Sequence, residues 1–322
     1  MPETFPAYVD VDYEDGADET PDTYPSLEAK LERAASVIAT GLEQHRNPAL
    51  LWTGGKDSTL ALHIARNVAK QKGLEAPPVV FIDHFQHFPE VHAFVECWAE
   101  EWDLDLIVAR NESIGNLVSD RDLEPGDEVV IDDLNDRNRW HARRILDYEK
   151  ETFPFLLDTY VGNHLLKTFA LNDTLDEHGF DGVISGVRWD EQEARADETF
   201  ISPRHDEDLY PPHNRIHPIL PFTERDVWDA FFSVVVPETV EGYPIGHVPD
   251  SRDDLPESVG SQSIPISTLY FDGYRSIGSE QSTERSGDEP AWKQDVNATA
   301  ERAGRAQDKE ELMDRLRTFG YM

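Results

Sequence analysis

The stretch from Ala49 to Ser58, Ala-Leu-Leu-Trp-Thr-Gly-Gly-Lys-Asp-Ser, limits the possible folds of this chain more than any other segment. A short apolar run ends there in two glycines, and a segment with helical apolar spacing, residues 59–68, follows at once. This order predicts a buried strand, a tight turn and the start of a helix. Units of this kind build parallel α/β sheets.

The turn has the chemistry of an anion-binding loop. Backbone N–H groups at a helix N-terminus point outward and carry partial positive charge. Gly54 and Gly55 permit positive φ and a close approach to the main chain. Lys56 adds a positive charge, and Ser58 adds a hydroxyl donor. We predict that residues 53–58, with Thr53 included, hold the phosphates of a nucleotide; the alternative is an ordinary glycine-rich turn with a surface lysine.

This loop is not a Walker A loop. That motif has a glycine five places before its Gly-Lys pair and a Ser or Thr after the lysine. Leu50 and Asp57 occupy those places here. A carboxylate beside phosphates suits a divalent cation that bridges them, so we expect Asp57 to bind Mg²⁺.

The chain is strongly acidic. Its 322 residues include 65 acidic and 29 basic side chains, for a formal charge of −36. The excess is spread along the chain, which favours adaptation to a high-salt cytoplasm, such as that of a halophilic archaeon, over one patch for a basic partner. Nucleic acid is excluded as a ligand, because phosphate contacts need clustered Lys and Arg.

The single cysteine, Cys97, excludes an internal disulfide and a Cys-rich metal site. It lies in a predicted helix on an apolar stripe, and we expect it in the core. No signal peptide opens the chain, and no apolar stretch approaches membrane-spanning length. We therefore expect a soluble, cytoplasmic protein that does not bind membranes.

Apolar runs alternate with segments of helical spacing along most of the chain. Strands are predicted at 50–52, 79–82, 104–109 and 182–185, with an extended segment at 215–220, and helices at 27–42, 59–68, 90–101 and 165–178. This alternation predicts an α/β fold with a doubly wound, mainly parallel sheet and helices on both faces.

The same pass predicts three regions. Residues 1–25 are acidic and should be poorly ordered. Residues 26–236 form the nucleotide-binding α/β domain, in which 110–155 reads as an insertion or lid. Residues 237–322 form an irregular C-terminal extension that ends in a helix at 301–319.

Candidate ligand-binding residues follow the predicted strands, because open parallel sheets bind ligands at the carboxyl ends of their strands. Asp83 follows the second strand and would accept a hydrogen bond from a ribose hydroxyl or an adenine amine, or else serve as a turn acid. Nearby His84, His87 and His92 have weak metal-ligand spacing, so we expect them to line the pocket or to be exposed.

Two later segments supply cations. Gly186 permits close backbone approach, and Arg188 and Arg195 offer forked donors for an anion, unless they pair with acids of the same loop. Arg215 and His217 share one face of an extended strand, where His217 would donate to an anion or be a structural histidine.

Together and in this order, these segments resemble the PP-loop ATP pyrophosphatase superfamily. They are most similar to its branch of phosphoadenylylsulfate (PAPS) reductases and small subunits of sulfate adenylyltransferase. The matching segments are 47–58, 81–83 with 87–90, 186–196 with 202–204, and 215–222; the tail at 301–305, 308 and 320–321 resembles the adenylyltransferase subunit. The resemblance implies an adenine nucleotide alpha hydrolase-like fold.

The resemblance also implies an activity. ATP and Mg²⁺ would bind at the loop, an oxyanion such as sulfate would attack the α-phosphorus, and pyrophosphate would leave. Lys56, Asp57 and Arg188 would be catalytic. Nucleotide contacts would come from Thr53, Gly54, Gly55, Lys56, Asp57, Ser58, Asp83 and Gly186, and anion contacts from Arg188, Arg195, Arg215 and His217. A GTPase partner subunit and a homo-oligomer are further expectations.

The chain departs from the family pattern in three places, one of which is that it does not contain the GTPase partner with which the adenylyltransferase subunit normally works. It lacks the C-terminal cysteine of the reductases, and Gly162-Asn163 stands where some relatives carry Cys-Cys. His84-Phe85 stands where relatives usually carry Thr-Gly. The first hypothesis is therefore adenylyl transfer; the alternatives are a reductase acting on adenylyl sulfate or PAPS, and a non-catalytic nucleotide-binding subunit.

Overall fold

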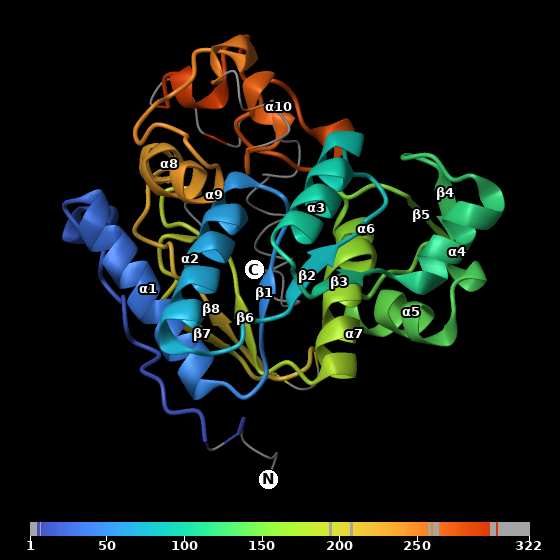
Figure 1. Ribbon diagram of the computed structural model, residues 1–322. Coiled ribbons are helices and arrows are strands. Elements are labelled where there is room, and N and C mark those ends of the chain that lie inside the picture. The colour runs from blue at the N-terminus through green and yellow to red at the C-terminus, as the bar shows by residue number, and fades with distance from the viewer. Residues whose placement is uncertain are drawn as a thin grey trace.

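A twisted sheet lies at the centre of the protein (Figure 1). The computed structural model describes residues 5–6, 8–192, 195–206, 209–256, 259, 264–296 and 301. In that part of the chain six strands pair in the order β3-β2-β1-β6-β8-β7. They are β1 (Pro48–Leu51), β2 (Val79–Ile82), β3 (Leu106–Ala109), β6 (Gly182–Ile184), β7 (Ile201–Arg204) and β8 (His213–Ile216). All neighbours are parallel except β7, which is antiparallel to β8, so the predicted doubly wound, mainly parallel sheet is confirmed.

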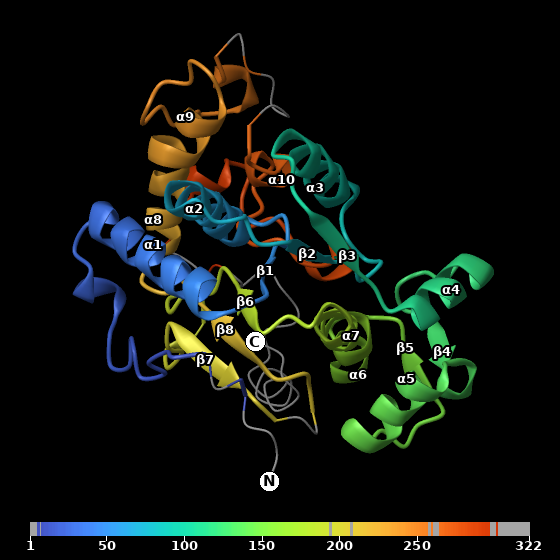
Figure 2. The same cartoon turned by 60° about the horizontal axis from the view of Figure 1, so that its bottom comes forward.

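Both faces of the sheet are covered by helices (Figure 2). Successive side chains of a strand point to opposite faces. Leu50 therefore packs with α1 (Leu27–Gln44), α2 (Lys56–Lys72), α3 (Pro89–Glu101) and α8 (Glu224–Ala230). Its neighbour Leu51 packs on the other face, with α7 (Phe169–His178).

The first and last residues of three elements differ from the boundaries predicted from the sequence. Helix α2 begins at Lys56 rather than at residue 59, because Gly55 is its extended N-cap, with φ −82° and ψ 159°. Strand β8 covers His213–Ile216, so the extended segment predicted at 215–220 starts earlier and ends earlier. The helix predicted at 165–178 is a π-helical turn, His164–Thr168, continued by α7.

The weakly patterned stretch between β3 and α7 forms a lobe beside the sheet (Figures 1 and 2). It contains α4 (Glu112–Arg121), β4 (Glu128–Val130), α5 (Asp136–Trp140), β5 (Thr152–Pro154), α6 (Tyr160–Asn163) and a π-helical turn at His141–Ile145. Strands β4 and β5 pair antiparallel, and the lobe has its own core around Val129 and Phe153. The predicted insertion is thus a small packed unit at the β3 edge.

The N-terminal segment packs along the sheet domain. The Tyr8 hydroxyl donates to Asp181 Oδ2 at 2.6 Å, the Tyr13 hydroxyl donates to Asn214 Oδ1 at 3.3 Å, and Arg33 pairs with Asp15. A 3₁₀ turn covers Pro21–Thr23. Poor order of residues 1–25 stays a prediction; among the described residues of this segment, Tyr8, Tyr13 and Asp15 have partners in the domain.

The described part of the C-terminal extension contains short elements and shares the main core. Its short elements are α9 (Val236–Thr239), which follows a π-helical turn at Phe231–Val235, α10 (Thr268–Phe271), and 3₁₀ turns at Arg252–Asp254, Glu280–Ser282 and Ala291–Lys293. Tyr270 and Trp292 stack edge-on against Trp228 of α8, with ring centroids 5.0 and 5.1 Å apart. The helix predicted at 301–319 lies outside the described residues, except for Glu301.

Cys97 corrects one expectation. The buried stripe of α3 consists of Val91, Phe94, Val95, Trp98 and Ala99, and Cys97 falls between its members and is exposed. The prediction of a core thiol was wrong, because one residue along a helix turns a side chain by about 100°.

In the described part of the chain, no helix is long and apolar enough to cross a membrane.

Candidate active site at the carboxyl edge of the sheet

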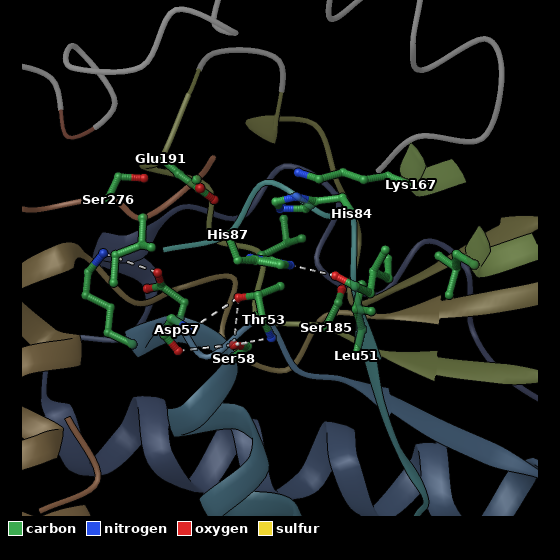
Figure 3. A pocket seen from close by; sticks show the side chains of 18 of the residues that line it. Leu51, Thr53, Asp57, Ser58, His84, His87, Lys167, Ser185, Glu191 and Ser276 are labelled. Atoms are coloured by element: carbon green, nitrogen blue, oxygen red, sulfur yellow. Dashed lines mark hydrogen bonds and ion pairs between the residues drawn. The ribbon is translucent and has the colours of Figure 1, made fainter. Parts of the chain in front are cut away.

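A cavity of about 170 Å³ opens where the chain leaves β1 and β6. These neighbouring strands mark the point at which the strand order reverses, the usual place for a ligand in such sheets. The first turn of α2, the end of β2 and the loop at 276–278 complete the wall (Figure 3). The predicted convergence of the strand ends is therefore present.

The loop between β1 and α2 is closed by its own hydrogen bonds. Ser58 Oγ accepts from the Thr53 amide at 3.1 Å, lies 3.1 Å from Thr53 Oγ1, and donates to the Gly55 carbonyl at 3.1 Å. Gly54 has φ +73°, a conformation that favours glycine. The positive φ allowed at both glycines is used at Gly54 alone, since Gly55 is extended.

Gly186 lets two segments of backbone meet. A Cβ on this residue would lie 2.6 Å from both Asp57 C and Ser58 N, inside van der Waals contact. The sequence predicted close backbone approach at this glycine, and the approaching backbone is that of the α2 first turn. The loop after β6 is thereby held directly against the anion-binding loop.

Three buried charges and the partly buried Asp57 meet beside the loop. Lys56 Nζ donates to Asp57 Oδ2 at 3.2 Å and also pairs with Glu301, while Arg188 pairs with both Asp57 and Glu301. The exposed fractions of Lys56, Arg188 and Glu301 are 2%, 0% and 8%. Each of the two cations therefore contacts both of these carboxylates.

The charges in this cluster shift one another's pKa values. Burial alone would raise the pKa of Glu301, but the charges of Arg188 and Lys56 outweigh it and hold the pKa well below its usual range. Burial alone would lower the pKa of Lys56, but Asp57 and Glu301 raise it above its ordinary value. Burial raises the pKa of Asp57 in spite of Arg188 and Lys56. Lys56 and Glu301 therefore depend on their counter-charges to remain ionised.

Arg188 is fully occupied by carboxylates. Besides Asp57 and Glu301, it donates through Nε to Asp190 Oδ1 at 2.8 Å. The sequence left open whether this arginine binds an anion or pairs with neighbouring acids. In the structure it makes the ion pairs.

The C-terminal extension contacts the loop directly. The Lys56 amide, the first of α2, donates to the Tyr270 hydroxyl at 2.8 Å, and Lys56 Nζ donates to the Arg275 carbonyl at 3.1 Å. Sequence reasoning missed both residues, because residues 237–290 carry no periodic pattern that would point to a site.

Arg215, on β8, also lines the cavity. It is 1% exposed, and among the described residues neither its Nε nor its Nη1 has a hydrogen-bond partner. Burial lowers the pKa of Arg215 to about 9. A buried guanidinium without acceptors is costly, so this position favours an anion.

Two more predicted residues lie near Arg215. Arg195 lines the same cavity and pairs with Glu191, while its Nε has no hydrogen-bond partner among the described residues. His217 is 1% exposed, its Nδ1 lies 2.9 Å from Ser185 Oγ, and within the described part of the chain its Nε2 has no hydrogen-bond partner. Burial lowers the pKa of His217 to about 3, which keeps the ring neutral. Arg195 and Arg215 thus line the cavity, and His217 is linked to it through the lining residue Ser185.

Asp83 serves as a turn acid. Its Oδ1 accepts from the Phe85 amide at 2.9 Å and its Oδ2 accepts from Arg110 Nε at 3.0 Å. Phe85 has φ +66°, a backbone conformation that favours glycine. Relatives usually carry glycine at this position, so phenylalanine keeps the same turn at the cost of backbone strain. The turn-acid alternative for Asp83 is the one observed.

The histidines after β2 line the pocket. His84 and His87 stack with ring centroids 3.5 Å apart, and both contribute to the cavity wall with Leu51 and Ile82 (Figure 3). No group of three or more His, Cys, Asp or Glu side chains that could hold a metal occurs among the described residues.

Some lining residues were not singled out from the sequence. They are Ser185, Lys167, Glu191 and Ser276 (Figure 3). Ser185 ends the predicted strand at 182–185, so its position at a carboxyl end was a usable signal. Lys167 and Ser276 reach the cavity by tertiary packing alone.

Comparison with known proteins gives a consistent family. A family model described as the phosphoadenosine phosphosulfate reductase domain matches residues 47–119 and 147–239, together more than half of the chain. Sulfate adenylyltransferase subunit 2 of Azospirillum brasilense is 29% identical over 71% of this chain, and that of Nocardia farcinica is 26% identical over 75%. The matches span 62% and 64% of those two relatives.

A solved structure was also compared. The PAPS reductase of Candida auris has 14% sequence identity and a TM-score of 0.48, and the match covers 80% of this chain and 96% of that protein.

Proposed function

This chain belongs to the phosphoadenosine phosphosulfate reductase domain family, and we propose that it transfers the adenylyl group of ATP to a small oxyanion with release of pyrophosphate. The names of the relatives support sulfate as the oxyanion and adenylyl sulfate as the product. One observation carries the proposal: the same cavity is lined by the anion-binding loop and by Arg215, a buried arginine whose Nε and Nη1 have no hydrogen-bond partner among the described residues. Adenylyl transfer brings two anions together in this way.

The loop from Thr53 to Ser58 is the proposed phosphate site. Its amides and Lys56 supply positive charge, and the α2 N-terminus adds its dipole. Gly186 brings the β6 loop close, so Arg188 lies beside the same phosphates. The base would lie against Leu51 and the stacked histidines. Asp83 is engaged in its turn, so its proposed nucleotide contact would require Arg110 to move away.

Magnesium fits one position. Asp57 is the carboxylate at the loop, and Mg²⁺ in phosphate sites is held by one or two carboxylates, with substrate phosphates and water as the other ligands. Both Asp57 oxygens now accept from cations, Oδ2 from Lys56 and Oδ1 from Arg188, so the ion would take the place of one of these partners. When bound, the ion would neutralise charge on the phosphates.

Arg215, Arg195 and His217 form the proposed oxyanion site, with Ser185 beside them. An oxyanion oxygen would attack the α-phosphorus, the bond from that phosphorus to the bridging oxygen would break, and pyrophosphate would leave with the electron pair. Protein groups would act by positioning and by balancing charge. Lys56 and Arg188 would face the charge that builds on pyrophosphate.

The relatives are named as one subunit of a larger enzyme, which supports a partner subunit for this chain. We propose a GTPase as that partner. Self-association remains a prediction.

The reductase alternative finds no support at the cavity. It needs a thiol nucleophile, and Cys97 is exposed on α3 and is not one of the residues that line the cavity. Replacing Cys97 with Ser should leave the activity unchanged.

Pyrophosphate release tests the proposal. With ATP and Mg²⁺, release should require sulfate and should rise when the GTPase partner and GTP are added. Chelation of the metal should stop it. Tight ATP binding without turnover of any oxyanion would instead identify a nucleotide-binding subunit.

A further inference from the structure

We propose that Glu301 is an internal competitor for the phosphate site, which a nucleotide must displace. Its carboxylate lies between Lys56 and Arg188, where a phosphate would make the same two contacts. The inference rests on the proposed binding of phosphates at this loop. It adds that the C-terminal extension sets the affinity for them.

The geometry is that of a bound anion. One carboxylate oxygen of Glu301 accepts from Lys56 and the other from Arg188, so the group bridges two cations from different elements. Lys56 is the first residue of α2, where the helix dipole attracts negative charge. Lys56 and Glu301 are 245 positions apart in sequence, so the contact is made by the fold.

Shared donors make the two occupants mutually exclusive. Lys56 and Arg188 already face three carboxylates, Asp57, Glu301 and Asp190, and the two cations themselves are buried. A phosphate cannot accept from Lys56 and Arg188 at the place where the Glu301 carboxylate accepts from both. A phosphate that replaces Glu301 keeps both cations paired.

Other contacts of the extension explain why Glu301 is the group that moves. Tyr270, which accepts from the Lys56 amide, is fixed by packing on Trp228. Glu301 is held by ion pairs, which an incoming anion can exchange one for one. The apparent affinity for nucleotide is then reduced by the fraction of molecules in which Glu301 occupies the site.

Calorimetric titration with a non-hydrolysable ATP analogue tests this. Glu301→Gln should lower the Kd about tenfold, equivalent to about 1.4 kcal/mol. The control is Glu284→Gln, since Glu284 is an exposed acid of the same extension. It removes one negative charge outside the site and should leave the Kd unchanged. Lys56→Ala should weaken binding in either background.

A measurement on the unmodified protein covers the case in which Glu301→Gln does not fold. Addition of inorganic tripolyphosphate should increase carbodiimide labelling of the Glu301 carboxylate, which is buried between Lys56 and Arg188 in the free protein, because the residue leaves the site. Unchanged labelling under saturating tripolyphosphate would overturn the inference.

The outcomes separate this inference from the proposed function. If the analogue binds the unmodified protein, Lys56→Ala weakens it and Glu301→Gln binds no tighter, the competitor role is refuted and the phosphate site stands. If neither the unmodified protein nor Glu301→Gln binds, both proposals fail.

Discussion

Arg188 and Asp57 form a buried ion pair that joins the loop after β6 to the first turn of α2. The two strands that carry these elements are neighbours, although more than a hundred residues separate them in sequence. The two backbones are also in contact at Gly186. The ion pair therefore lies where the sheet topology already brings the loop after β6 against α2. The candidate site is thus positioned by the rigid centre of the sheet.

Arg215→Met should stabilise the fold and remove function. Deleting a buried guanidinium with two unpartnered nitrogens relieves a desolvation penalty of about 1–3 kcal/mol. Urea unfolding should show the gain, while sulfate-dependent pyrophosphate release disappears. Arg204→Met is the control, because Arg204 lies 3.5 Å from Glu198, and it should not stabilise. If Arg215→Met lowered the free energy of unfolding, the conclusion that Arg215 has buried nitrogens without hydrogen-bond partners would be wrong.

Gly186→Ala should destabilise the protein by about 1–3 kcal/mol, since the new methyl group overlaps backbone atoms at 2.6 Å. The backbone of α2 would have to shift, and nucleotide affinity should fall with it. Gly115→Ala offers a comparison, because a Cβ there meets the Phe85 ring at 3.2 Å rather than backbone. Equal stability of the two variants in urea would refute the close approach.

Stability should fall as the pH drops below about 6.5. Burial lowers the pKa of His164 and of His217 to about 3, so both stay neutral in the folded protein while the unfolded chain binds protons. Each should cost about 1 kcal/mol by pH 5.5. Denaturation at pH 7.5, 6.5 and 5.5 measures the slope, and His164→Gln should flatten it. A pH-independent free energy of unfolding would count against both.

Salt should stabilise this chain. At a formal charge of −36, self-repulsion is strong in dilute buffer and is screened in concentrated salt. The melting temperature should rise steeply from dilute buffer to molar KCl. Molar sucrose, which is uncharged, is the control for general solvent effects. A flat or falling melting temperature in KCl would refute the adaptation to salt.

Sequence reasoning succeeded where the signal was local. Gly54, Lys56 and Ser58 form a continuous motif, and the strand predicted at 79–82 matches β2 without a shift. It did not find Tyr270, because that residue lies in a segment without a periodic pattern and contacts α2 only through tertiary packing. Cys97 was misplaced by a single helical step. For Asp83 and Arg188 the sequence left open whether the side chain contacts a ligand or another side chain. The contacts with Arg110 and Glu301 that bear on this depend on the fold.

The hydrogen bonds that link Thr53, Gly55 and Ser58 have a thermodynamic consequence. Because the loop already holds this shape in the free protein, a ligand does not have to order it. Most of the backbone entropy of the loop is lost on folding and not on binding. Association should therefore be fast and rigid-body in character at this rim. Any slow step would have to come from elsewhere in the molecule.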